Sequence, residues 1–249
     1  MASSVFSLEG KTVLVTGASS GIGRSIAILC SQMGAKVFIS ARREEKLTQT
    51  ISAMHGDNVY IVADLSKQEE IDKLVNSLPK LDGIVHCAGV GSRNLCKNVT
   101  REEMDYVMGA NFVAPVMLQG LILAKKKINN GASIVFIASH GATSPASSNS
   151  IYSASKGAII SYSKCLALEL APRGIRVNCI SPAMVWTDLI VRDGIDDETL
   201  HEDEKHYPLG RYGKPEDIAP LAVYLLSDGS SWMTTTDVKI TGGGNLTPC

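Results

Sequence analysis

A turn rich in glycine joins a short apolar run to a longer amphipathic one near the start of the chain. Lys11–Thr16 is β-branched and typical of a strand, whereas Ile22–Met33 has the period of a helix. Between them, Gly17 can form a tight turn, Gly21 lets backbone approach a pyrophosphate, and Gly23 lets the helix pack against the strand. Because the first N–H groups of a helix are free to bind anions, the turn predicts a phosphate site. The expected loop also contains Ser19, Ser20 and Ile22.

Five further β-branched runs follow, separated by segments of helical length and period. This alternation is typical of a parallel sheet covered by helices on both faces. The sequence therefore predicts an α/β fold, a Rossmann-like doubly wound sheet in a three-layer sandwich. The five runs are Lys36–Ser40, Asn58–Val62, Gly83–His86, Ser133–Ala138 and Arg176–Ile180.

Helix starts and domain limits can also be predicted. The patterns Ser66-x-x-Glu69 and Thr100-x-x-Glu103 each fit a capping box, which places a helix start after the third and the fourth strand. No repeat or linker divides the chain, so we expect a single domain of residues 1–249. The acid-rich segment Asp188–His206 indicates a small substrate loop at about residues 184–210.

Charge and hydropathy exclude several functional classes. The 249 residues include 24 Lys and Arg against 25 Asp and Glu, and no polybasic stretch, which disfavours nucleic acid as a partner. The longest apolar stretch, Phe112–Ala124, is shorter than the ~20 residues of a membrane span. The N-terminal residues lack the pattern of a secretory signal, so we expect a cytoplasmic protein without membrane contact.

Cysteines and histidines give no metal-binding pattern. No Cys-x-x-Cys or His-Glu-x-x-His spacing occurs, and we expect free thiols and no metal site. The residues concerned are Cys30, Cys87, Cys96, Cys165, Cys179 and Cys249, with His55, His86, His140, His201 and His206.

The end of the second expected strand indicates which dinucleotide is bound. Sites that prefer NAD carry an acid there, about 20 residues after the glycines, to bind the ribose 2'-hydroxyl. This chain has Ala41 at that position, followed by Arg42 and Arg43, whose guanidiniums can bind a 2'-phosphate. We therefore expect NADP(H), with Arg42 as the main contact. The alternative is that both arginines are solvated charges at a helix start.

A tyrosine and a lysine four residues apart form the candidate proton-transfer pair. Tyr152 and Lys156 share one face of an expected helix from Ile151 to about Ala171. A neighbouring ammonium favours the phenolate of a tyrosine, whose unperturbed pKa is ~10. Ser139 follows the fifth strand, at the sheet edge where such folds bind ligands, and Asn111 interrupts an apolar helix.

Taken together, the Thr-Gly-x-x-x-Gly-x-Gly turn, Asn111, Ser139 and Tyr152-x-x-x-Lys156 resemble the short-chain dehydrogenase/reductase family, in its compact single-domain branch. The resemblance implies that Tyr152 is the general acid or base and that Ser139 binds the same substrate oxygen. It implies that Lys156 holds the nicotinamide ribose and lowers the tyrosine pKa, while Asn111 organises a water that passes protons toward Lys156.

Further cofactor contacts follow from the same resemblance. Asp64 matches the residue that contacts adenine, although it could equally be a loop acid near the Ser66 cap. Pro182 and Thr187 match the segment that touches the carboxamide. The remaining expected cofactor-binding positions are Leu65, Ala88 and Gly89.

The chain departs from the family pattern at three places. Asn-Asn-Ala-Gly after the fourth strand is replaced by residues 86–89, His-Cys-Ala-Gly, and the purpose of the Cys87 thiol does not follow from the sequence. The family's Pro-Gly is Pro182-Ala183, and Thr235 replaces a glycine before the last strand. Because no catalytic side chain is lost, we expect the activity to be retained.

The expected function is an NADP(H)-dependent oxidoreductase that transfers a hydride between the nicotinamide and a carbonyl or secondary alcohol. The alternative is an NADP(H)-binding regulatory or scaffold protein with little activity. A serine hydrolase is disfavoured because Ser139 lacks the Gly-x-Ser-x-Gly context. A sugar epimerase normally has a different glycine spacing and a larger C-terminal region.

The substrate is constrained only broadly. The chain is similar in general to 3-oxoacyl-carrier-protein reductases and to the sugar, steroid and polyol dehydrogenases near them, so the small substrate could be linked to a carrier. The helices containing Asn111 and Tyr152 are apolar on more than one face, which indicates that each side is buried. In the family that the chain resembles, these helices pair between subunits, so the resemblance implies a homotetramer. The expected pocket wall is Met184, Trp186 and Leu189; the acids of the loop are Asp193, Asp196, Asp197 and Glu198; and an acidic carrier could meet Lys125, Lys126, Lys127 and Arg173.

Overall fold

Seven parallel strands form one continuous sheet in the order β3-β2-β1-β4-β5-β6-β7. The computed structural model describes residues 4–191 and 196–244. The chain winds outward from β1 to β3 and then returns to the other side of β1, so the direction of winding reverses between β1 and β4. Ligands of such sheets bind at this reversal, beyond the carboxyl ends of the strands. The strands are β1 (Thr12–Thr16), β2 (Lys36–Ala41), β3 (Val59–Val62), β4 (Leu81–His86), β5 (Ile128–Ile137), β6 (Arg176–Pro182) and β7 (Asp237–Ile240).

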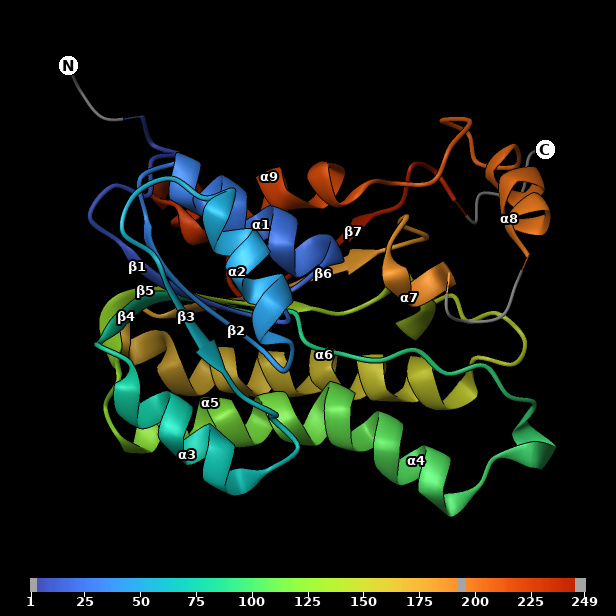
Figure 1. Ribbon diagram of the computed structural model, residues 1–249, viewed down its shortest axis with the longest axis horizontal. Coiled ribbons are helices and arrows are strands. Elements are labelled where there is room, and N and C mark those ends of the chain that lie inside the picture. The colour runs from blue at the N-terminus through green and yellow to red at the C-terminus, as the bar shows by residue number, and fades with distance from the viewer. Residues whose placement is uncertain (1–3, 192–195, 245–249) are drawn as a thin grey trace.

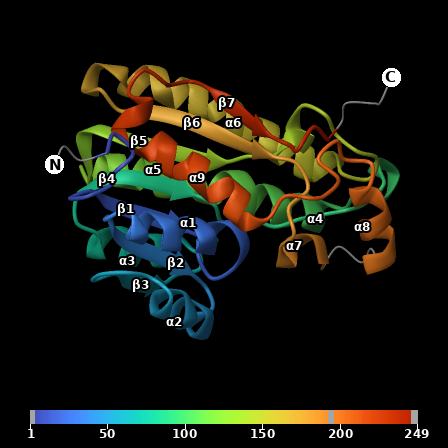
Figure 2. The same cartoon turned by 90° about the horizontal axis from the view of Figure 1, so that it is seen from above.

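Helices cover both faces of the sheet and confirm the predicted three-layer fold (Figures 1 and 2). One apolar core lies under α3, α5 and α6, and the other lies under α1, α2 and α9. Burial of these two cores is the main force that holds the layers together. The helices are α1 (Gly21–Gln32), α2 (Glu44–Ser52), α3 (Gln68–Ser77), α4 (Arg101–Met108), α5 (Ala114–Ala124), α6 (Ser150–Leu170), α7 (Asp188–Val191), α8 (Asp197–Glu204) and α9 (Pro215–Leu226).

The six predicted strands all occur, with one large difference in length. β5 begins at Ile128, five residues before the predicted start at Ser133. Ile128 pairs with Leu81, and the register then shifts before Gly83 pairs with Ser133. Residues 129–131, Asn-Asn-Gly, interrupt the apolar pattern of β5 at this irregularity, so the sequence did not predict the first part of the strand.

Of the two predicted capping boxes, the one at Ser66 is wrong. The helix α3 begins at Gln68 with Lys67 as its N-cap. The Ser66 hydroxyl instead donates to Asp64 Oδ1 at 2.8 Å, in a turn that follows β3. The Ser66 hydroxyl therefore binds Asp64 in the turn and does not form the α3 cap that the sequence pattern predicts.

The second cap is half confirmed. Thr100 is the N-cap of α4, and its hydroxyl accepts from Glu103 N at 3.2 Å. The Glu103 carboxylate does not return to the Thr100 N–H as a full box would require. It accepts from Ser92 and Asn94 in the preceding loop and ties that loop to the helix.

The expected helix around Asn111 is one helical stretch of 24 residues, Arg101–Ala124, interrupted by a π-helical segment, Gly109–Val113. It is the one helix in the described ranges that is long and apolar enough to cross a membrane, with a mean hydropathy of 1.7 in its most apolar window. Leu118 and Ile122 lie in the core beneath the sheet, so the stretch is a core helix.

Candidate active site

The glycine turn lies at the carboxyl end of β1, beside the end of β4. Gly17 has a φ of +67°, and a Cβ added there would lie 2.8 Å from the Ala88 backbone. A Cβ on Gly23 would lie 2.5 Å from the Gly17 carbonyl oxygen. The turn thus has the close backbone packing predicted for it. Sequence reasoning missed Thr16, whose Oγ1 accepts from Cys87 N at 3.1 Å and fixes the two strand ends together; its position between a strand and Gly17 was the available signal.

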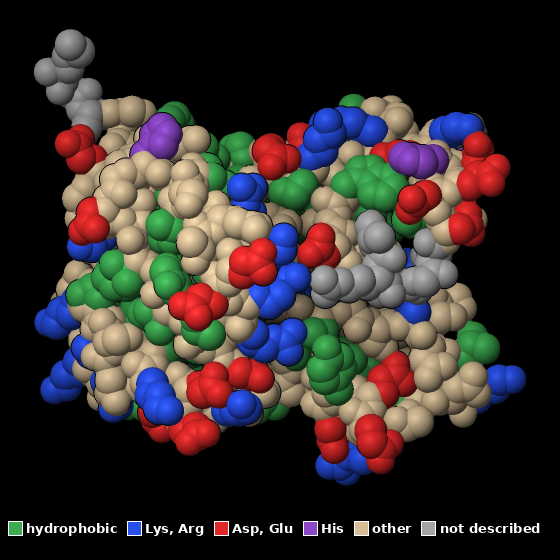
Figure 3. All heavy atoms as spheres, in the orientation of Figure 1, with side chains coloured by type: hydrophobic (Ala, Val, Ile, Leu, Met, Phe, Trp, Pro, Cys, Tyr) green, Lys and Arg blue, Asp and Glu red, His purple; other side chains and the backbone are tan. Residues whose placement is uncertain are grey.

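Arg43 reaches the glycine turn and connects it to the loop after β6. Its Nη2 donates to Ser20 Oγ at 3.2 Å and to Ser19 Oγ at 3.4 Å. The same nitrogen lies 3.8 Å from Asp188 Oδ2. Figure 3 shows basic side chains gathered between the start of α2 and α7, with acidic side chains beside them. The guanidinium therefore lies at the predicted phosphate loop.

Arg42 faces a different neighbour, the carboxylate of Asp64. Partial burial would raise the pKa of Asp64, but hydrogen bonds from Ser66 and the charges of Arg42 and Lys67 lower it. Asp64 is therefore a charged loop acid that organises the turn after β3 and lies close to Arg42. Leu65 and Ile22 pack at the margins of the two apolar cores.

Gly89 brings the end of β4 against Asn111 and Lys156. A Cβ on Gly89 would lie 2.9 Å from Asn111 Oδ1 and 3.4 Å from Lys156 Nζ. The Asn111 side chain is buried; its Oδ1 accepts from Val90 N at 2.8 Å, and its Nδ2 donates to Ser155 Oγ and to Val90 O, each at 3.0 Å. Asn111 therefore fixes the loop after β4 to α6, and Ser155 is a partner that the sequence did not indicate.

Tyr152 and Lys156 lie on α6, with Lys156 Nζ 5.8 Å from the Tyr152 ring centre. Lys156 is 6% exposed, and its Nζ donates to the Ile137 carbonyl oxygen at 2.9 Å. Burial lowers the pKa of Lys156 to about 8, because a charge is disfavoured away from water. The lysine is therefore held close to the tyrosine at a position that weakens its preference for the charged form.

Ser139 follows β5 and precedes the loop to α6. Its Oγ accepts from Gly141 N at 3.1 Å. Because that bond uses a lone pair, the hydroxyl hydrogen remains available to a ligand oxygen. The neighbouring His140 is buried and faces Asp237 and Lys239 of β7, and its pKa is lowered by burial and by Lys239. His140 therefore belongs to the packing between strand ends.

The segment after β6 passes over the glycine turn. Pro182 is the last residue of β6 and pairs with Ile240, and a Cβ on Gly21 would lie 3.1 Å from the Thr187 methyl group. The structure thus brings Thr187 to the predicted phosphate loop, although 166 residues separate it from Gly21.

The predicted apolar wall packs against the acid-rich segment in the structure. Trp186 packs with Met184 around a small apolar cluster of Ile190, Leu200 and Tyr212. Its Nε1 donates to Glu204 Oε1 at 2.6 Å, which fastens the loop to α8. Asp196 caps α8 by accepting from Thr199 N at 2.8 Å. Asp197 and Glu198 are exposed in the first turn of α8, Leu189 lies in α7, and Asp193 and Cys249 fall outside the described residues.

His86 and Cys87, which stand where the family pattern has two asparagines, are both uncharged in the structure. His86 stacks on Phe136, with 4.5 Å between ring centres, and its Nε2 donates to Gln119 Oε1 at 2.9 Å. Burial lowers the pKa of His86 to about 4 and raises that of Cys87 to about 12. A neutral imidazole and a neutral thiol therefore replace the two amides of the family pattern.

His86 should make the protein sensitive to mild acid. The unfolded chain gains a proton on this histidine near pH 6.5, whereas the folded protein resists protonation until about pH 4, so stability falls as pH falls through this window. We expect wild type to lose about 2 kcal/mol more than His86→Asn between pH 7.5 and pH 5. Urea unfolding followed by fluorescence at both pH values measures this. The exposed His55→Asn is the control, and equal losses in wild type and His86→Asn would contradict the prediction.

The basic residues predicted to meet a carrier lie at the end of the sheet opposite to Ser139 of the same chain. Lys125 and Lys127 follow α5 and lie next to the start of β5, which extends roughly 30 Å to the Ser139 end. Lys125 binds Asn76, Lys127 binds the Leu78 carbonyl, and Arg173 binds the Ile128 carbonyl. With Lys126 beside them, these residues bind groups at the end of α3 and the start of β5, away from Ser139 of the same chain.

Comparison with known proteins matches this architecture. A family model described as enoyl-(acyl carrier protein) reductase matches residues 17–245. The 3-oxoacyl-[acyl-carrier-protein] reductase FabG of Rickettsia felis is 34% identical over 236 residues, which cover 95% of this chain and 97% of the relative. The chain belongs to the short-chain dehydrogenase/reductase family. The predicted family resemblance is thereby confirmed.

Two solved short-chain dehydrogenase/reductase structures were determined with a nicotinamide dinucleotide. The 3-ketoacyl-(acyl-carrier-protein) reductase of Brucella melitensis, complexed with NADH, is 32% identical with a TM-score of 0.86, covering 95% of this chain and 99% of that one. A putative NAD(P)-dependent gluconate 5-dehydrogenase from Beutenbergia cavernae with bound NADP is also 32% identical, with a TM-score of 0.87 and coverages of 96% and 98%.

This short-chain dehydrogenase/reductase is an oxidoreductase that acts on carbonyl or alcohol groups with a nicotinamide cofactor. The residues present fit such a group, because α1 begins at Gly21 without a side-chain cap, which leaves its first N–H groups to an anion, and the glycines allow the tight turn before it. The described residues also contain no cluster of His, Cys, Asp or Glu that could hold a metal ion.

Proposed function

We propose that the protein is an NADP(H)-dependent carbonyl reductase or alcohol dehydrogenase in which Tyr152 is the general acid or base. The observation that carries the proposal is the position of Lys156, whose Nζ lies 5.8 Å from the Tyr152 ring centre and donates to the Ile137 carbonyl oxygen at the end of β5, two residues before Ser139. When bound, the nicotinamide dinucleotide supplies the hydride for carbonyl reduction or accepts it in alcohol oxidation.

The side chains divide the remaining chemistry. Ser139 donates its free hydroxyl hydrogen to the substrate oxygen, and Tyr152 gives that oxygen a proton during reduction or removes one during oxidation. Lys156 binds the nicotinamide ribose and favours the phenolate of Tyr152 by its charge. Asn111 holds the loop after β4 in place and organises the water that passes protons toward Lys156.

The proposed cofactor contacts begin at the glycine turn, which forms the cofactor cradle. Gly17, Ser19, Ser20, Gly21, Ile22 and Gly23 would hold the pyrophosphate, and Asp64 and Leu65 would contact the adenine. Ala88 and Gly89 would offer their backbone to the ribose, and Pro182 and Thr187 would contact the carboxamide. Arg42 and Arg43 would bind the 2'-phosphate, and the hydrogen bonds of Arg43 to the serines of the turn support this role.

A panel of carbonyls and alcohols, followed by nicotinamide absorbance with NADP(H) and with NAD(H), tests the activity. Turnover of at least one compound, faster with NADP(H), is expected. Binding of NADPH without turnover of any compound would favour the alternative, a regulatory or scaffold protein that retains the fold.

Arg42 should set the preference for NADP(H). A charge-assisted hydrogen bond contributes about 1.5–3 kcal/mol, so Arg42→Ala is expected to weaken NADPH binding about 10- to 100-fold and to leave NADH binding nearly unchanged. Fluorescence titration with both cofactors measures the two dissociation constants. The control is Lys46→Ala, on the exposed side of α2. Equal weakening of NADPH and NADH, or tighter binding of NADH by wild type, would contradict the assignment.

We also propose a single domain of residues 1–249, with residues 184–210 as the substrate loop, and a cytoplasmic homotetramer. Exposed apolar side chains support the assembly: Tyr106 is 57% and Leu168 71% exposed, and both lie on the helices predicted to pair between subunits. A small neutral carbonyl, free or carrier-linked, is the proposed substrate; no nucleic acid or membrane partner is proposed. A carrier would have to approach the Ser139 end of the sheet.

A further inference from the structure

One buried serine of α6 differs from the others on the same helix. Ser155 Oγ donates to the Tyr152 carbonyl at 2.7 Å, and Ser163 Oγ donates to the Ile160 carbonyl at 2.8 Å. Ser153 is only 8% exposed, yet its Oγ has no hydrogen-bond partner among the described residues. A buried hydroxyl without a partner is costly, so its retention calls for a ligand.

Asn149, at the N-cap of α6, is the second unusual side chain. Thr100 and Asp196 accept hydrogen bonds from their own helices, as N-cap residues commonly do. The Asn149 side chain makes no capping bond to α6. The Asn149 amide therefore does not cap α6, although it stands at the N-cap position.

Gly141 brings both side chains into one space with Ser139. A Cβ at Gly141 would lie 3.3 Å from Ser139 Oγ, 3.6 Å from Asn149 Nδ2 and 3.6 Å from Ser153 Oγ. The two hydroxyls are therefore no more than about 7 Å apart, since both lie within 3.6 Å of the same point. The absence of a side chain at Gly141 leaves this space to the three polar groups.

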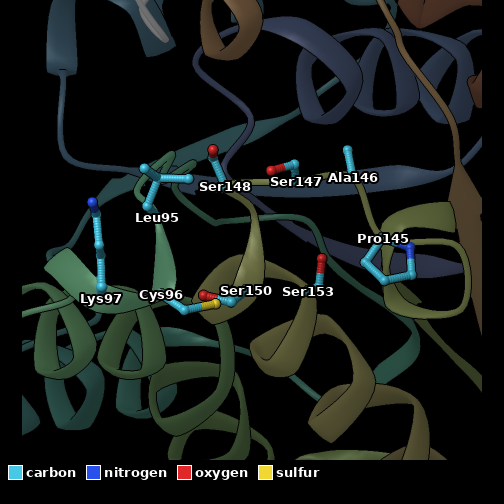
Figure 4. A pocket seen from close by; sticks show the side chains of 9 residues that line it. All are labelled: Leu95, Cys96, Lys97, Pro145, Ala146, Ser147, Ser148, Ser150 and Ser153. Atoms are coloured by element: carbon cyan, nitrogen blue, oxygen red, sulfur yellow. The ribbon is translucent and has the colours of Figure 1, made fainter.

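The Ser153 hydroxyl also borders a cavity of about 520 Å³. Figure 4 shows it directed toward the 145–148 segment, with residues 95–97 on another side of the same cavity. Leu95, Pro145 and Ala146 give apolar walls, and among the described residues that line the cavity Lys97 alone is charged. A neutral, partly apolar group fits this cavity.

We propose that Ser153 and Asn149 form a subsite for a second substrate oxygen, next to the reacting oxygen at Ser139. The substrate would be a neutral ketone, or the matching alcohol, with another oxygen on the α or β carbon and its remaining chain in the cavity. Asn149 Nδ2 donates, and Ser153 can donate or accept, so a hydroxyl and a carbonyl both satisfy the pair. This assignment rests on the proposed function, because it specifies the substrate of that site.

The test compares ketones that differ only in the second oxygen. Reduction of 2-butanone is measured beside that of 3-hydroxy-2-butanone, 4-hydroxy-2-butanone and 2,3-butanedione, which separate α from β position and hydroxyl from carbonyl. Wild type should prefer at least one oxygenated ketone by at least tenfold in kcat/KM. Ser153→Ala and Asn149→Ala should each reduce that preference about three- to tenfold, mainly through KM, and should change 2-butanone less than twofold. Ser163→Ala, on the same helix, is the matched control.

Binding is measured separately so that the two proposals can fail independently. In Tyr152→Phe with NADPH bound, ligand-observed NMR should show the oxygenated ketone binding at least tenfold more tightly than 2-butanone, and Ser153→Ala should reduce this difference. Turnover with no such preference, or a preference that neither substitution alters, overturns the subsite and leaves the proposed function standing. Preferential binding without turnover of any ketone overturns the proposed function and leaves the subsite standing. The absence of both overturns both.

Discussion

Replacing Tyr152 by phenylalanine is expected to lower kcat by about 10²- to 10⁴-fold, the usual contribution of a positioned acid or base. The substitution removes one hydroxyl and keeps the ring near Lys156, whose Nζ lies 5.8 Å from the ring centre. The affinity for NADPH should change less than twofold, because the glycine cradle and Lys156 are untouched. Steady-state turnover and fluorescence titration with NADPH measure the two effects.

A second tyrosine on the same helix gives the control for this result. Tyr162 packs edge-on against Phe136 and Phe112 in the core below the sheet. Tyr162→Phe removes an equivalent hydroxyl far from Ser139, and it should retain activity. Turnover by Tyr152→Phe within tenfold of wild type would show that another group transfers the proton.

Replacing Gly17 by alanine is expected to destabilise the protein by more than about 2 kcal/mol and to weaken cofactor binding at least tenfold. Two independent causes act together. The φ of +67° is unfavourable for any residue with a Cβ, and that Cβ would lie 2.8 Å from the Ala88 backbone. The turn or the end of β4 must therefore move, and both belong to the proposed cofactor site.

Gly10 separates these two causes. It also has a positive φ, +76°, but a Cβ there would meet nothing within 4 Å. Gly10→Ala should therefore show the conformational cost alone, about 1 kcal/mol, with unchanged NADPH affinity. Urea unfolding and NADPH titration of both variants make the comparison. If the two substitutions had equal effects on both measurements, close packing of Gly17 against Ala88 would not explain the glycine.

The sequence predicted the parts of the molecule that follow from local patterns. Strand periodicity and the glycine turn place β1, α1 and the carboxyl sheet edge correctly, and the Tyr152 to Lys156 spacing puts both side chains on α6. Local patterns failed where another group competed for the same side chain. Ser66 bonds to Asp64 in a turn, so it does not cap α3.

Other features depend on contacts between distant segments, which no local pattern encodes. Lys125 and Arg173 are among the residues predicted to meet a carrier, but the strand direction puts them at the end of the sheet away from Ser139 of the same chain. The proximity of Asn149, Ser153 and Gly141 arises from the path of the loop before α6. No motif in the sequence joins these three residues, and their proximity appears only in the folded chain.

The apolar cluster of Ile190, Leu200 and Tyr212 has a consequence for how this enzyme can diversify. It is separate from the two cores that hold the sheet, so mutations within it need not disturb the cofactor cradle. Within the proposed substrate loop, we therefore expect substitutions around this cluster to change substrate preference. Thr187, the proposed cofactor contact beside Gly21, has to be kept in any such exchange.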